Sequence, residues 1–141
     1  MSHEVLQLAE QEFILRRIHK NHVDPAPSAV IGFAGFRPTL EDTRGLSVYQ
    51  EKYASPAEVA AGGRKPGEYY VVRLSVAALR RLGLSVVTDE REQGPLGHAL
   101  VPELSLSAYQ QDRQKLREIQ VRLAVLASQD IVLAPASSTT G

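Results

Sequence analysis

The chain contains no cysteine, and this absence removes several kinds of chemistry at once. Disulfide bonds, thiolate catalysis and zinc sites built on cysteine are all excluded. No sign of charge dominates either, because sixteen lysine and arginine residues balance sixteen aspartate and glutamate residues. The sequence therefore lacks the broad positive field with which proteins attract nucleic acids or acidic membranes.

Long hydrophobic runs are also missing. The apolar runs are a handful of residues long, whereas a helix that crosses a bilayer needs about 20. The N-terminus, Met1 to Glu4, has no basic segment followed by an apolar one, which a secretory signal would have. From these absences we expect no membrane segment and a cytoplasmic location.

The length and composition indicate one globular domain. A chain of 141 residues can bury about two-thirds of its unfolded surface around a single core. The hydrophobic fraction of 43% is ordinary for a folded protein. We expect one domain over residues 1–134 and a flexible tail over residues 135–141, whose sequence PASSTTG is small and mostly polar.

Helix signals appear in four places. Residues 2–12 predict a helix, with Ser2 as its cap and apolar residues at helical spacing, while residues 13–19 fit either a helix or a strand. A capping box at Ser55 to Glu58 predicts a short helix that Gly62 and Gly63 end. Two further helices are predicted, a short one over 76–82 capped by Ser75 and a long one over 107–128.

Strand patterns fill much of the remaining chain. Alternating or β-rich composition predicts strands over five segments: 29–36, 46–49, 68–75, 84–88 and 98–101. Residues 131–133 fit a strand or a packed tail. A strand, a short helix and a strand within about 20 residues leave too little chain for a parallel crossover. The predicted fold is a single α+β domain with a small, mostly antiparallel sheet, an N-terminal helix and a long C-terminal helix.

The loop from Phe36 to Ser47 is a candidate functional surface. Arg37 stands between Phe36 and Pro38, which restrict the backbone and so aim the guanidinium. Asp42 follows on the same turn. The two charged residues therefore either bind a ligand or form a clasp that pins the loop.

A second candidate is the cationic segment from Arg16 to His22. It holds five groups that can be cationic, among them Arg17 and His19, and arginine has a planar fork that matches phosphate or carboxylate. The alternative is a solvated helix end. His19 and His22 could share a metal only if the segment were helical, and no third ligand is evident, so we expect no metal site.

His98 is the third candidate. It opens a predicted strand after a Gly-Pro-Leu-Gly turn, where a histidine side chain can face a cleft or simply satisfy a backbone carbonyl. Ser47 lacks the Gly-x-Ser-x-Gly pattern of a nucleophile elbow. Since no Ser–His–Asp order is evident, the sequence does not predict a hydrolase triad.

From Leu15 to Leu126 the chain resembles a family of small uncharacterised bacterial proteins. The shared pattern is Arg-Arg-Ile-His, Phe-Arg-Pro, Asp, Leu-Ser-Val-Tyr, Leu-Gly-Leu-x-Val and a late His-Ala. In this chain these elements are residues 16–19, 36–38, 42, 46–49, 82–86 and 98–99. The resemblance supplies no activity.

The chain also resembles, more weakly, RES-type domains, which cleave NAD on a fold like that of ADP-ribosyltransferases. Arg16 or Arg17, Arg37, Tyr49 and Ala57-Glu58 stand at comparable places. The chain departs from that family where Gly-Phe-Arg-Pro replaces the Gly-Arg-Trp/Phe-Asn signature, and no residue is assigned as the catalytic glutamate.

Two functions remain open. The first is a non-catalytic accessory or interaction module of a bacterial multi-protein system, bound to a protein partner in a hetero- or homo-oligomer and needing no cofactor. The second is an enzyme that binds a nucleotide or NAD. The binding candidates are Arg17, His19, Arg37, Asp42, Ser47, Tyr49 and His98.

Overall fold

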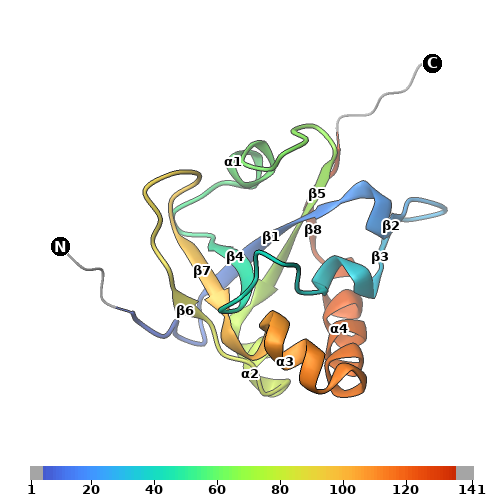
Figure 1. Ribbon diagram of the computed structural model, residues 1–141. Helices are drawn as coiled ribbons and strands as arrows, with labels where there is room; N and C mark the ends of the chain where they lie inside the picture. Colours follow the sequence, from blue (N-terminus) through green and yellow to red (C-terminus); the bar gives the residue numbers. More distant parts are fainter. Residues whose placement is uncertain (1–4, 136–141) are drawn as a thin grey trace, which may run out of the picture.

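The computed structural model describes residues 5–135 (Figure 1). The α-helices are α1 (Pro56–Ala61), α2 (Val76–Arg81), α3 (Leu106–Gln111) and α4 (Arg113–Ser128). The strands are β1 (Phe13–His19), β2 (Val23–Asp24), β3 (Val30–Ile31), β4 (Leu46–Gln50), β5 (Tyr69–Ser75), β6 (Val87–Thr88), β7 (His98–Val101) and β8 (Ile131–Leu133). Three 3₁₀ turns complete the list: η1 (Lys20–His22), η2 (Phe33–Phe36) and η3 (Pro102–Leu104).

Six strands form one sheet in the order β6-β7-β4-β1-β5-β8, and every neighbouring pair is antiparallel. The short strands β2 and β3 pair separately. The predicted α+β class with a mostly antiparallel sheet is therefore confirmed. As the short spacing around α2 indicated, β5 and β6 do not pair, and they stand on opposite sides of β1.

The predicted N-terminal helix is wrong for the residues that can be described. Leu8 donates its N–H to Val86 and Leu6 accepts that of Thr88, so this segment extends the sheet beside β6. Residues 13–19 are β1, whose successive residues Ile14 and Leu15 are both buried, one on each face of the sheet. A strand buried on both faces reads as a continuous apolar run.

The predicted strand over 29–36 is also mostly wrong. Only Val30–Ile31 is extended, and a 3₁₀ turn follows. Gly32 does allow the close approach of another backbone, because a Cβ there would lie 3.0 Å from the carbonyl oxygen of His22. The strand predicted over 84–88 is limited to β6.

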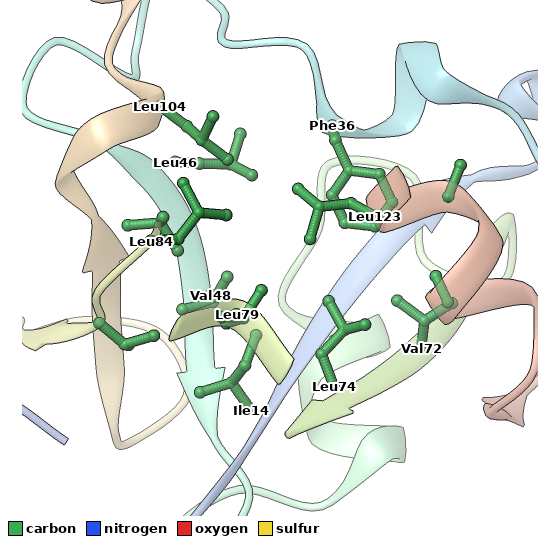
Figure 2. Packing of buried hydrophobic residues seen from close by; sticks show 14 of the residues in the cluster. Ile14, Phe36, Leu46, Val48, Val72, Leu74, Leu79, Leu84, Leu104 and Leu123 are labelled. Carbon is green, nitrogen blue, oxygen red and sulfur yellow. The ribbon is translucent and has the colours of Figure 1, made fainter. Parts of the chain in front are cut away.

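The larger core covers one face of the sheet. Alternate residues of the central strands, such as Ile14, Val48 and Leu74, pack against α2, α4 and η2 (Figure 2). Phe36 of η2 and Leu123 of α4 lie side by side within this core. These helices lie together below the sheet in Figure 1.

The opposite face carries a smaller core beneath α1. It consists of six buried residues: Leu15, Tyr49, Ala54, Val59, Ala60 and Val71. The predicted capping box is confirmed, since Ser55 and Glu58 exchange hydrogen bonds at the start of α1. In Figure 1 this helix stands alone above the sheet.

The long C-terminal helix is two helices rather than one. Ser105 caps α3, and Asp112 ends α3 and caps α4 with a non-helical backbone at φ −149° and ψ 77°. The predicted cap of α2 at Ser75 is confirmed. Residues 131–133, which fitted either a strand or a packed tail, form the strand β8.

No helix within residues 5–135 is both long enough and apolar enough to cross a membrane. The flexible tail predicted over 135–141 lies almost entirely outside the described residues.

Candidate functional site

Three neighbouring strands bring a row of polar and aromatic side chains onto one face of the sheet. Tyr49 on β4 lies directly opposite Leu15 on β1 and His98 on β7. Because residues two apart along a strand share a face, Arg17 and Ser47 lie on this face as well. We call Arg17, Ser47, Tyr49 and His98 the sheet-face row; all four are candidates from the sequence, and the structure brings them together.

His98 is the centre of a hydrogen-bonded chain in this row. Its Nε2 contacts the Ser47 hydroxyl, and its Nδ1 lies 3.0 Å from a carboxylate oxygen and 3.0 Å from the backbone carbonyl oxygen of Asp89. Two acceptors at Nδ1 place the ring hydrogen there. The Ser47 hydroxyl then donates to Nε2 while the hydrogen on Nδ1 is donated to Asp89. Both hydrogen bonds therefore run in the same direction, from serine through histidine to aspartate.

The surroundings keep the His98 ring neutral. The residue is only 1% exposed, and its ring meets the Tyr49 ring edge to face with centroids 5.2 Å apart. Burial lowers the pKa of His98, the charge of Arg91 lowers it further, and Asp89 opposes both. At neutral pH the imidazole is therefore the unprotonated form, which accepts a proton.

Asp89 is fixed from several sides. Its carboxylate lies 3.0 Å from Nη2 of Arg44 and 3.3 Å from Nε of Arg91, and its N–H donates to the carbonyl of His98. Both arginine side chains are at least half exposed, so they close the solvent side of the carboxylate. The sequence did not single out Asp89, because nothing local distinguishes it within a polar loop.

Arg17 forms the other end of the row. Its Nη1 donates to the carbonyl of Val59 in α1 at 2.9 Å, and its guanidinium lies over the Tyr49 and Tyr69 rings, 5.4 and 6.0 Å from their centroids. These contacts orient the planar fork between two aromatic rings.

The end of α1 and the loop 89–97 meet above Arg17. A Cβ added at Gly62 would lie 2.9 Å from Pro95 and 3.3 Å from Nη1 of Arg17. Glycine is therefore required for this close approach, since a methyl group would push the loop or the arginine aside.

His19 continues the same face beyond Arg17. Its Nε2 is 2.9 Å from Glu68, and its ring meets Tyr69 edge to face. The hydrogen bond from His19 is the main cause that lowers the pKa of the Glu68 carboxyl. His22 lies in η1 rather than on a helix with His19, and residues 5–135 hold no group of three or more His, Asp or Glu arranged to bind a metal ion.

Arg16 points to the opposite face and has a structural role. Its guanidinium donates to the carbonyls of Gly35 at 2.9 Å and Ser47 at 2.7 Å and lies over the Phe36 ring. Burial lowers the pKa of Arg16 to about 10, partly opposed by the charge of Asp42, so the group stays cationic at neutral pH. The cationic segment is thus a strand whose arginines serve different faces, not a solvated helix end.

The clasp proposed between Arg37 and Asp42 is wrong. Asp42 accepts hydrogen bonds from the N–H and hydroxyl of Thr39, so its carboxylate closes a local turn. Arg37 is exposed, and within the described chain no hydrogen bond or ion pair joins it to Asp42 or to the sheet-face row. Neither residue belongs to the site around His98.

An apolar groove lies between β3, η2 and α4, on the side of the sheet that carries the larger core. Its volume is about 410 Å³. Val30, Val121 and Val125 in its lining are about half exposed, and the others are Ile31, Phe33, Ala124, Ser128 and Gln129. We call this the α4 groove.

Comparisons with protein-family models, with characterised proteins and with solved structures gave no significant match.

Proposed function

We propose that this protein is an enzyme that binds a nucleotide, with NAD as the first candidate, on the sheet-face row. The observation that supports this most directly is the convergence of Arg17, Tyr49 and His98 from three adjacent strands. The partly exposed guanidinium of Arg17 and hydroxyl of Ser47 are groups that recognise phosphate and ribose, and the buried His98 orients the hydroxyl.

Arg17 is the proposed phosphate ligand. The described contacts use one N–H of its guanidinium, toward Val59, and the fork carries five donors. Tyr49 and Tyr69 hold the fork in place. Tyr49 is buried, so the partly exposed Tyr69 is the ring that a base would contact.

Thermal unfolding of the full chain against a panel of NAD, NADP, ADP-ribose, ATP and AMP tests the proposal. A nucleotide present at a hundred times its dissociation constant stabilises the fold by about 2.7 kcal/mol. Isothermal titration then gives the affinity, and release of nicotinamide reports NAD cleavage.

Matched arginine variants make the test specific. Arg17→Lys keeps the charge but loses the fork, and we expect it to weaken binding about tenfold or more. Arg37→Ala removes an exposed arginine outside the row and should bind as the unaltered chain does. Absence of a shift with every nucleotide, or equal weakening in both variants, would refute the proposal.

The α4 groove supports a second candidate function, an interaction module. An apolar groove beside a helix fits the hydrophobic face of an amphipathic partner helix, including one from a second copy of the chain. Sedimentation velocity over a range of concentrations tests the homo-oligomeric form. A dimer that dissociates in Val121→Asp and persists in Val5→Asp, where the exposed valine lies outside the groove, would support it. A chain that is monomeric at every concentration would exclude that form.

A further inference from the structure

The Ser47–His98–Asp89 chain has the connectivity of an activated nucleophile. The hydroxyl contacts Nε2, and Nδ1 faces the carboxylate at 3.0 Å. Nucleophile, base and orienting acid occupy the same order in serine enzymes of unrelated folds, and the arrangement is recognised by geometry rather than by sequence position. Ser47 needs no nucleophile elbow to take part in it.

The tautomer of His98 is the one that this chemistry requires. The carboxylate and the backbone carbonyl of Asp89 both accept at Nδ1, so Nε2 has no hydrogen of its own and can take the one from Ser47. The two arginines on Asp89 and the ring of Tyr49 beside His98 restrict movement of the three groups. The base is thereby held in its productive orientation before any substrate arrives.

Solvent exposure differs among the members of the hydrogen-bonded Ser47–His98–Asp89 chain. His98 is buried, whereas Ser47 is partly exposed, so the hydroxyl is the end that meets a ligand. Leu100 lies directly opposite Ser47 on β7, and Val87 lies opposite Leu100 on β6. Together they give the hydroxyl an apolar neighbourhood suited to a short acyl group.

We propose that Ser47 is a nucleophile toward activated carboxylic esters with a short acyl chain, with His98 as its general base and Asp89 as the residue that orients the histidine. The Ser47 oxygen forms a bond to the ester carbonyl carbon while Nε2 takes the hydroxyl proton. The tetrahedral intermediate expels the alcohol, which leaves with that proton, and an acyl-serine remains. Water then attacks the acyl-serine by the same route, which releases the carboxylic acid and restores the hydroxyl.

This inference does not depend on the nucleotide proposal, because the hydrogen-bonded chain consists of protein groups alone. Labelling of Ser47 without any nucleotide binding would leave it standing while the proposed function fell. Nucleotide binding without labelling would refute the nucleophile and leave the nucleotide proposal standing.

A fluorophosphonate probe and p-nitrophenyl acetate test it on the full chain. The probe should add to the peptide that contains Ser47, with loss of fluoride, and p-nitrophenyl acetate should release a burst of nitrophenol that matches the amount of acetyl-Ser47 in the mass spectrum. Both products should disappear in Ser47→Ala. They should persist in Ser85→Ala, which removes another partly exposed hydroxyl, one bound to Glu103 with no histidine in contact.

Variants of the other two residues test the roles. Loss of a general base reduces such a step by about 100-fold or more, so His98→Gln should slow labelling by that factor. Asp89→Asn provides the same test at a less buried position should His98→Gln not fold, as judged by circular dichroism. Folded wild-type protein without an adduct on Ser47, or labelling at an unchanged rate in a folded Asp89→Asn variant, would overturn the proposal.

Discussion

The two faces of β4 contain alternate residues of the same five-residue strand but differ in character. Leu46 and Val48 point into the larger core, where both are 1% exposed and belong to the same apolar cluster. Ser47 and Tyr49 point the other way, toward Arg17 and His98. Because successive residues of a strand face opposite sides, the purely apolar pair lies in the larger core, and the other pair joins the sheet-face row, with Tyr49 also part of the smaller core.

This separation implies that the polar face depends on the apolar one for its geometry. A hydrogen-bonded chain in partial burial needs fixed strand positions, and the packed face supplies them. Substitutions on the two faces should therefore affect different measurements.

Leu46→Ala should give the largest loss of stability. Truncation of a buried leucine leaves a cavity and lowers the free energy of unfolding by about 2–5 kcal/mol. Leu40→Ala is the control, because Leu40 is 84% exposed and its truncation should change stability by less than about 0.5 kcal/mol. Urea unfolding measures both. At temperatures where Leu46→Ala remains folded, it should still bind whatever ligand the unaltered protein binds.

His98→Ala should give the next largest loss of stability. It removes a buried ring and leaves the Ser47 hydroxyl and one face of the Asp89 carboxylate without their partner, for a loss of about 1–3 kcal/mol. Ser47→Ala deletes only one hydroxyl and should cost less. If His98→Ala were as stable as the unaltered chain, the hydrogen-bonded chain would not be an ordered part of the fold.

Acidification should lower the free energy of unfolding through His98 on the polar face. A histidine in an unfolded chain has a pKa of about 6.5, and burial lowers the pKa of His98 in the folded protein. Between these two values the unfolded state binds more protons, so the stability is complete above about pH 6.5 and falls as the pH drops through the folded pKa.

Equilibrium unfolding at a series of pH values checks this. His98→Gln should show a shallower loss as the pH falls below about 6.5. Burial also lowers the pKa of His22, so this residue contributes to the same loss of stability and should cause part of the loss that persists in His98→Gln. The carboxyls of Glu12 and Glu68 have lowered pKa values too, so their contribution is lost only below the ordinary carboxyl value of 4.5. Parallel curves for His98→Gln and the unaltered protein would contradict the assignment.

Arg37→Ala should have the smallest effect. The side chain is exposed and its neighbours Phe36 and Pro38 carry the packing, so stability should change by less than about 0.5 kcal/mol. A larger loss in thermal unfolding would show that the guanidinium supports the loop after all.

The elements that could be predicted are those with local signals. The capping box at Ser55, the cap at Ser75 and the alternation of residues 68–75 each lie within a few residues of the structure that they specify. The N-terminal error has a physical cause, because pairing beside β6, far along the chain, outweighed a helical spacing of apolar residues. The break at Asp112 interrupts a stripe that would otherwise continue as one helix.

The sequence predicted the four residues of the sheet-face row but neither the contacts between them nor Asp89. Arg17, Ser47, Tyr49 and His98 each stood out as a residue type, yet Ser47 and His98 are 51 residues apart and meet only through the pairing of β4 with β7. Asp89 became visible only when the sheet placed its loop beside His98. Arg37 and Asp42 were neighbours in sequence and still did not meet, because Thr39 offered Asp42 a closer donor.

The order of the strands has a consequence at the sheet's margins. The outermost strands, β6 and β8, are two and three residues long, and the segment around Gln7 already pairs with β6. Recognition by strand addition needs a longer run of open backbone N–H and C=O groups. A second chain that paired at either of these strands would therefore find only a short edge, so the described sheet offers little opportunity for extension into a larger assembly.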